Sequence, residues 1–245
     1  MSESQQYHEG VEYRIGKSTG EEFISDVMTA HLIELNKICG NSGTPLEGNL
    51  FYKHHTPNIE TLDMPDARRV QKRRNFCRAI GGKKNLLEIG FNGGHSALLA
   101  LSCSPNLRIT CVDIGRNSYV NPCANYMKEN FQQRFEIIIG DSRDIIPELS
   151  LFSDQRFDII HIDGGHGVKN CLADTANALA LRSPGVPRHI LLDDTNATQI
   201  FEIYQRFVTH GYLVPDSKND TWEGRESLLA RIADNIVRAS DFGGD

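Results

Sequence analysis

Carboxylates recur at the ends of short apolar runs in this chain. They are Glu88, Asp113, Asp141, Asp163 and the pair Asp193–Asp194. A carboxylate accepts hydrogen bonds through two oxygens, so it can hold a pair of neighbouring hydroxyls. Oxygen donors are also the ligands that Mg²⁺ prefers. Random placement would scatter acids over both ends of such runs. The pattern therefore predicts one acidic binding region, suited to a hydroxylated or cationic ligand and to a divalent ion.

A glycine-rich turn indicates what the ligand is. Residues 85–96 read NLLEIGFNGGHS, an apolar run containing Glu88 and followed by Gly90, Gly93 and Gly94. A strand, a glycine turn and a helix start present bare backbone N–H groups to an anion, whereas Glu88 favours a cation. Together these groups fit the amino-acid end of S-adenosylmethionine better than a pyrophosphate. The dinucleotide fingerprint G-x-G-x-x-G is absent, and an ordinary turn without a ligand is the other interpretation.

Apolar runs alternate with helical stretches, which predicts the fold. Strands are expected at 86–89, 107–112, 135–139, 157–162, 189–192, 211–214 and 227–232. Helices are expected at 21–39, 65–80, 119–131, 145–151, 168–182 and 197–210, with another starting at 97. Such repeats require right-handed crossovers and helices on both faces. We predict an α/β fold: a doubly wound, mostly parallel, seven-stranded Rossmann-like sheet with an antiparallel edge strand and an N-terminal helical extension. Ligands bind such sheets at the carboxyl ends of the strands, where the acids fall.

The chain divides into two expected parts. Residues 1–62 form an arm, a helix and a lid-like loop, and residues 63–245 form the ligand-binding domain. The polar start, 1–20, is expected to be a loose arm. The 41–58 loop carries Tyr52, Lys53, His54 and His55, which fit a surface loop or a lid over the ligand. The amphipathic helix before it either lines the acceptor pocket or builds a dimer interface, and the sequence leaves both open.

Composition limits the classes of function. The chain has 245 residues and a formal net charge of −6, which disfavours a non-specific grip on nucleic acid. The basic helix at 65–80 has no aromatic platform, so a solvated face is favoured there. The 6 cysteines contain no C-x-x-C pair, which is typical of reduced thiols in a cytosolic enzyme. With neither a signal peptide nor a membrane span in the sequence, we expect a cytoplasmic protein without membrane partners.

Four stretches carry a resemblance to known proteins. They are LLEIGFNGGHSA (86–97), GDSRDIIPEL (140–149), DIIHIDGGH (158–166) and LLDDTN (191–196). Over roughly residues 65–235 the chain resembles class I S-adenosylmethionine-dependent methyltransferases. Within that class it is similar to catechol O-methyltransferase-like and macrocin-type small-molecule O-methyltransferases. The resemblance implies transfer of a methyl group to a hydroxyl of a small molecule, with Mg²⁺ and a homodimer or higher homo-oligomer expected.

The resemblance also implies a set of site residues. The cofactor-binding residues would be Glu88, Gly90, Phe91, Asn92, Gly93, Ser96, Asp113, Asp141, Ser142 and Asp163. Asp113 would bind the ribose, and Ser142 would lie at the adenine. Metal ligands would be Asp163, Asp193 and Asp194. Thr195 stands where the catechol enzymes have an asparagine, whereas Asp193–Asp194 matches the paired acids of the macrocin type, so the third ligand stays open.

The base is the remaining catalytic prediction. His166 occupies the place where the catechol enzymes have a lysine base, and its usual pKa near 6.5 suits proton transfer near neutral pH. Asp163 is the alternative base. Other classes remain open: a metal-independent N- or C-methyltransferase, an inactive cofactor-binding interaction module, an NAD-binding oxidoreductase and a nucleic-acid methyltransferase. The glycine spacing disfavours the oxidoreductase, and the net charge disfavours the last.

Overall fold

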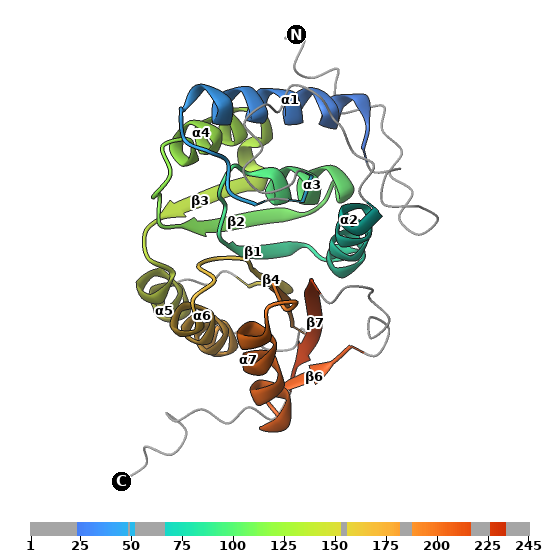
Figure 1. Cartoon of the computed structure of the whole chain (residues 1–245), viewed down its shortest axis with the longest axis vertical. Helices are drawn as coiled ribbons and strands as arrows, with labels where there is room; N and C mark the ends of the chain where they lie inside the picture. Colours follow the sequence, from blue (N-terminus) through green and yellow to red (C-terminus); the bar gives the residue numbers. More distant parts are fainter. Residues whose placement is uncertain are drawn as a thin grey trace. The chain divides into compact units, whose positions relative to one another are not determined.

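The described strands form one seven-stranded sheet (Figure 1). The computed structural model describes residues 24–48, 50–51, 67–152, 156–181, 188–216 and 226–233. The strands are β1 (Asn85–Ile89), β2 (Arg108–Asp113), β3 (Phe135–Ile139), β4 (Ile159–Ile162), β5 (His189–Asp193), β6 (Leu213–Pro215) and β7 (Ser227–Ile232). Their order in the sheet is β3-β2-β1-β4-β5-β7-β6.

Seven α-helices belong to the described residues. They are α1 (Asp26–Asn41), α2 (Ala67–Ile80), α3 (His95–Cys103), α4 (Val120–Phe131), α5 (Ser142–Phe152), α6 (Val168–Ala180) and α7 (Thr198–Thr209), with a short 3-10 turn, η2 (Gln132–Arg134). The Ser25 side chain accepts the Met28 backbone N–H and so begins α1 five residues after the predicted start. None of these helices is long and apolar enough to span a bilayer.

The predicted fold class is confirmed. β4 runs parallel to both β1 and β5, whereas β7 pairs antiparallel with β5 and with β6. The antiparallel pairing therefore lies at one edge of the sheet, as predicted. In detail, β7 inserts between β5 and β6, so the outermost strand is β6 and not the last strand of the chain.

The chain separates into two compact units. Unit 1 comprises Met1–Gly82, Phe91–Ile109 and Gly115–Ile137. In this unit α1 packs against α3 and α4, and α2 packs against α3. The buried side of α1 includes Met28, Leu32 and Leu35. The apolar face of this predicted amphipathic helix is therefore covered within the chain.

Unit 2 comprises Lys83–Gly90, Thr110–Ile114 and Ile138–Asp245. Its helices α5, α6 and α7 contribute to one apolar core with alternate residues of the sheet, such as Leu87, Ile160 and Leu192. Because side chains alternate along a strand, the residues between these point to the other side of the sheet. The strand-end acids of the predicted site lie mainly on that side.

Several predictions fall outside the described residues. These concern the arm at 1–20, the cluster 52–55 and the boundary at 62/63. They remain predictions.

Candidate functional site

Register places the acidic residues of unit 2 in rows. Glu88 is the neighbour of His161, and His161 is the neighbour of Leu191. Two residues further along, Asp163 follows β4 and Asp193 ends β5, so both project from the same side of the sheet as Glu88. The sequence pattern thus becomes one polar surface at the carboxyl ends of parallel strands.

Glu88 is a fully buried carboxylate with two neighbours. Its Oε1 lies 3.0 Å from Nδ1 of His161, and its Oε2 accepts a hydrogen bond from Sγ of Cys111 at 3.3 Å. Burial lowers the pKa of His161, but the Glu88 hydrogen bond and the charges of Asp163, Glu88 and Asp193 outweigh it, so the pKa is raised overall. Burial, followed by the charge of Glu88, raises the pKa of Cys111. The pair therefore favours an imidazolium next to a carboxylate.

Gly90 is required by the backbone that passes next to it. Its φ is +98°, and a Cβ here would lie 2.1 Å from the carbonyl oxygen of Asp163. The Gly90 N–H donates to Val112 O, and the Asp163 N–H donates to Ile89 O. The turn after β1 and the turn after β4 therefore approach each other as closely as backbone allows.

The predicted metal ligands fall into two overlapping groups. Donor atoms of Asp163, His166 and Asp194 lie within 4.8 Å of one another, and the same holds for His161, Asp163 and Asp193. Asp163 belongs to both groups, whereas Asp193 and Asp194 are divided between them. Asp193 accepts a hydrogen bond from the Ser227 hydroxyl at 2.6 Å. The more exposed group can hold a divalent ion through its two carboxylates, which suits Mg²⁺.

Asp194 and His166 contact each other beyond the strand ends. Nε2 of His166 lies 2.9 Å from Oδ2 of Asp194, and the His166 side chain is 61% exposed. Asp194 has φ +55°, a left-handed conformation that is uncommon for residues other than glycine. Such strain is frequent at functional sites, and here it accompanies the contact between the carboxylate and the imidazole.

Asp113 lies at the end of β2 next to exposed apolar surface. The Asp113 carbonyl accepts the Gly140 N–H at 2.8 Å, which brings the ends of β2 and β3 together. Ile114 is 63% exposed and Ile139 is 44% exposed. A carboxylate beside two exposed apolar side chains can serve a ligand that has hydroxyls and a flat apolar ring.

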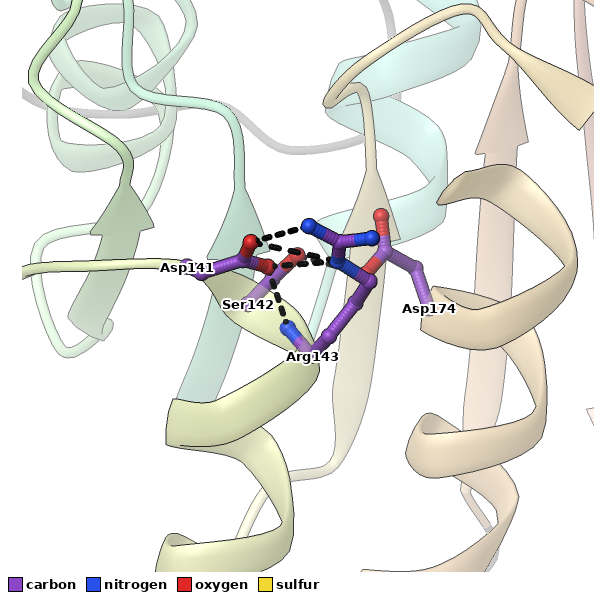
Figure 2. A network of polar contacts seen from close by, with 4 residues as sticks. All are labelled: Asp141, Ser142, Arg143 and Asp174. Carbon is purple, nitrogen blue, oxygen red and sulfur yellow. Dashed lines mark hydrogen bonds and ion pairs between the residues drawn. The ribbon is translucent and has the colours of Figure 1, made fainter. Parts of the chain in front are cut away.

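Asp141 and Ser142 form the turn into α5 (Figure 2). Asp141 accepts the backbone N–H and the guanidinium of Arg143, and these hydrogen bonds lower the pKa of Asp141 to about 2. Oγ of Ser142 donates to Oδ1 of Asp174 at 2.6 Å. Asp141 and Ser142, both predicted to bind the cofactor, therefore have partners within the protein.

The glycine turn continues in unit 1. Phe91 is buried, its ring lies 5.5 Å from that of Phe135, and a Cβ at Gly94 would lie 2.7 Å from it. The ring is thus a core group, and only the backbone of Phe91 is suited to a ligand. Ser96 is buried in the first turn of α3.

Asn92 connects this turn to the segment after α1. It has φ +52°, and its Nδ2 donates to Gly48 O at 3.0 Å. Its Oδ1 accepts the Tyr119 hydroxyl at 2.6 Å, and Asn117 donates to that hydroxyl. The described start of the predicted lid-like loop is therefore held against the turn that carries Asn92 and Gly93.

Sequence reasoning missed His161, Cys111, Arg143 and Asp174. A signal for His161 was present, since it lies two residues before Asp163 on a predicted strand and so shares its side. Asp174 is a polar residue on the apolar stripe of its helix, three residues after Cys171 and four before Ala178. The same spacing holds for Cys111, which lies two residues before Asp113 on a predicted strand.

Part of the chain matches known proteins. Residues 87–195 match a family model described as a methyltransferase domain. The O-methyltransferase imqG of Aspergillus flavus is 33% identical over 70 residues, which span 29% of this chain and 28% of that protein. The match thus covers less than a third of that curated relative.

Solved structures show the same fold. An O-methyltransferase from Bacillus cereus, in complex with SAH, has 18% identity and a TM-score of 0.59, covering 93% of this chain and 96% of that one. The O-methyltransferase TomG from Streptomyces achromogenes, involved in tomaymycin synthesis and in complex with SAM, has 14% identity and a TM-score of 0.53, covering 95% and 99%. The SAH-bound Podospora anserina methyltransferase PaMTH1 has 14% identity and a TM-score of 0.54, covering 86% and 88%.

The fold is Rossmann-like, as in these solved methyltransferase structures. Residues 87–195 match a methyltransferase domain, and the O-methyltransferase from Bacillus cereus shares the fold of the chain.

Proposed function

We propose that this protein transfers the methyl group of S-adenosylmethionine to a hydroxyl of a small molecule, with help from a divalent metal ion. The observation that carries the proposal is the gathering of Asp163, His166 and Asp194 within 4.8 Å at the strand ends of a methyltransferase domain. Metal-binding carboxylates next to a basic imidazole suit the deprotonation of a hydroxyl. Two of the structural relatives are O-methyltransferases bound to SAH or SAM, which supports the same acceptor atom and cofactor here.

The adenosine part of the cofactor fits the ends of β2 and β3. Asp113 would accept hydrogen bonds from the two ribose hydroxyls. Exposed Ile114 and Ile139 offer apolar surface to the adenine ring. Asp141 and Ser142 would meet the adenine edge, which requires the exposed Arg143 side chain to release part of the Asp141 carboxylate.

The methionine end would meet the glycine turn. Gly90 leaves no room for a side chain, so its backbone can approach a ligand closely. Asn92, Gly93 and Ser96 continue the chain from this point into the first turn of α3, where N–H groups favour a carboxylate. The negative charge of the Glu88 carboxylate, which is buried next to His161, would attract the ammonium group of the ligand.

Asp163 and Asp194 would hold the metal ion, and Asp193 would support them from the end of β5. When bound, Mg²⁺ lowers the pKa of a hydroxyl that it binds and stabilises the resulting oxyanion. His166 would act as a base and not as a metal ligand, because Mg²⁺ favours oxygen ligands. With Nε2 donating to Asp194, Nδ1 of His166 carries the lone pair that accepts the hydroxyl proton. Asp163 is the alternative acceptor of that proton.

The two halves of the site have different tasks. Methyl transfer from a sulfonium is an in-line displacement, so donor carbon and acceptor oxygen must be aligned. The residues at β1, β2 and β3 would fix the donor, and those following β4 and β5 would fix and deprotonate the acceptor. We further propose a cytoplasmic homo-oligomer, and analytical ultracentrifugation would test the oligomeric state.

A methyl-transfer screen tests the proposal. The full chain is incubated with methyl-labelled S-adenosylmethionine and a panel of phenols and hydroxylated metabolites, with Mg²⁺ or with EDTA. Labelled ether products that need Mg²⁺ would support the proposal. Products labelled on nitrogen or carbon and insensitive to EDTA would replace it with metal-independent methyl transfer. Cofactor binding without any product across the panel would favour an interaction module.

A further inference from the structure

One buried carboxylate contacts two turns at the strand ends. Asp174, in the middle of α6, is 1% exposed. Its Oδ1 accepts a hydrogen bond from Oγ of Ser142 at 2.6 Å, and Ser142 is the first residue of α5. Its Oδ2 lies 3.4 Å from the position that a Cβ would occupy at Gly164, the residue after Asp163. One side chain therefore adjoins the turn after β3 and the turn after β4.

A carboxylate is a costly choice at this position. Burial raises the pKa of Asp174, and the hydrogen bond from Ser142 works against that rise. The neighbours of Asp174 on the same stripe of α6, Cys171 and Ala178, belong to the apolar core. An apolar residue would fill the place without desolvating a charge. The hydrogen bond that Oδ1 accepts from Ser142 is therefore the reason for a carboxylate here.

Charges of both signs lie near Asp174. Figure 2 shows the Arg143 side chain between Asp141 and Asp174. The guanidinium is bound to Asp141, with Nε 2.9 Å from Oδ1. The positive charge of Arg143 favours the ionised form of Asp174, whereas the negative charge of Asp141 disfavours it. The Asp141–Ser142 turn and Asp174 thus form one polar network.

We propose that Asp174 is a positioning residue that holds the Asp141–Ser142 turn and the Asp163–His166 turn in one fixed arrangement. The inference rests on the function proposed above, in which the first turn meets the adenine and the second carries the base and a metal ligand. Asp174 touches neither donor nor acceptor and acts through Ser142 and the backbone at Gly164. Replacing Asp174 should raise the Kd of the cofactor, and this increase should not be explained by a loss of folding stability.

Binding of S-adenosylhomocysteine to the full chain, measured by titration calorimetry, tests the proposal. We expect Ser142→Ala and Asp174→Ala each to raise Kd about tenfold, as for one hydrogen bond to a charged group. The double variant should bind no more weakly than Ser142→Ala alone, because Asp174 acts on the first turn through the Ser142 hydroxyl, which is then already absent. Asp174→Asn keeps an oxygen that can accept from Ser142, so it should restore most of the affinity.

Ser150→Ala is the matched control. Oγ of Ser150 donates to Ala180 O at 3.1 Å, which also joins α5 to the end of α6 but far from the strand ends. It should leave Kd within twofold. Unchanged Kd in Ser142→Ala and Asp174→Ala, with only melting temperatures lowered, would overturn this inference and leave the proposed function standing. Absence of binding by the unaltered chain would overturn the proposed function instead.

Discussion

Nδ1 of His161 lies 3.0 Å from Oε1 of Glu88 on the neighbouring strand, and both side chains are buried. The pair lies on the side of the sheet from which Asp163 and Asp193 project, each two residues further along its strand. A buried charge that loses its partner costs far more than an exposed one. The pair should therefore be the most sensitive polar contact under the proposed site.

Removing one member of this pair should destabilise the protein strongly. We expect Glu88→Leu to lower the free energy of unfolding by about 3–5 kcal/mol, because it leaves His161 buried without its carboxylate. Glu88→Leu/His161→Leu should lose less than the sum of the two single changes. Urea unfolding of the four proteins measures this coupling.

An exposed ion pair provides the control. Lys37 and Glu34 lie 2.6 Å apart on α1 with side chains 60% and 46% exposed. Glu34→Ala should cost less than about 1 kcal/mol. Equal losses for Glu34→Ala and Glu88→Leu would contradict the account of the buried pair.

Gly90→Ala tests the close approach of the two turns. The new Cβ would meet Asp163 O at 2.1 Å, in a conformation with φ +98°. We expect the free energy of unfolding to fall by about 3 kcal/mol or more, from overpacking and backbone strain together. Gly211→Ala has a similar φ of +75° but nothing within 4 Å, so strain alone should cost about 1 kcal/mol. Similar melting temperatures for the two variants would argue against the contact with Asp163.

His95 should make stability depend on pH. Its Nε2 lies 2.9 Å from Oδ1 of Asn36, and burial lowers its pKa to about 4 from 6.5. Between these values the unfolded chain binds more protons than the folded one, so stability falls as the pH falls from 6.5 towards 4. The full loss is about 3 kcal/mol.

Variants at two histidines isolate this contribution. In His95→Gln, the free energy of unfolding should depend less steeply on pH between pH 6.5 and 5 than in the unaltered protein. His210→Gln changes an exposed histidine at the end of α7 and should leave this pH dependence unchanged. Urea unfolding at several pH values gives the slopes, and parallel slopes for the unaltered protein and His95→Gln would refute the assignment.

His166 and the metal ligands should control turnover. We expect His166→Ala to lower kcat by about 10²–10⁴-fold, as for loss of a general base. Chelation, or Asp194→Asn, should lower methyl transfer and abolish any rise in melting temperature on adding Mg²⁺. Glu202→Gln, at an exposed carboxylate of α7, should change neither. Near-normal turnover in His166→Ala would assign the role of base to Asp163. Full activity after chelation would show that methyl transfer does not require a metal ion.

Most of the fold could be predicted from the sequence, because most strands are short apolar runs that are followed by glycine or an acidic residue. Leu86, Leu87 and Ile89 mark β1 as clearly in the sequence as in the structure. The insertion of β7 between β5 and β6 was not readable, because apolar content says nothing about which neighbour a strand selects. Register, once known, explains why Asp163 and Asp193 share one side of the sheet.

The sequence predicted which residues belong to the candidate site but not which contacts they make with one another. The sequence placed Asp141 at a ligand, yet Arg143, two residues later, occupies its carboxylate and turns it into the cap of α5. Adjacent acids looked equivalent, but Asp193 ends a regular strand while Asp194 turns into a left-handed conformation towards His166. Partners from distant segments, such as His161 for Glu88, depend on tertiary packing that no local pattern encodes.

Titration of S-adenosylhomocysteine into the unaltered chain and into Asp113→Ala tests the central claim most directly. The account predicts binding of one ligand per chain, weakened about 10-fold or more when the proposed ribose acceptor is removed, as for a hydrogen bond to a charged group. Glu202→Gln should bind like the unaltered chain. No heat of binding in the unaltered chain, or equal affinity in Asp113→Ala, would contradict it.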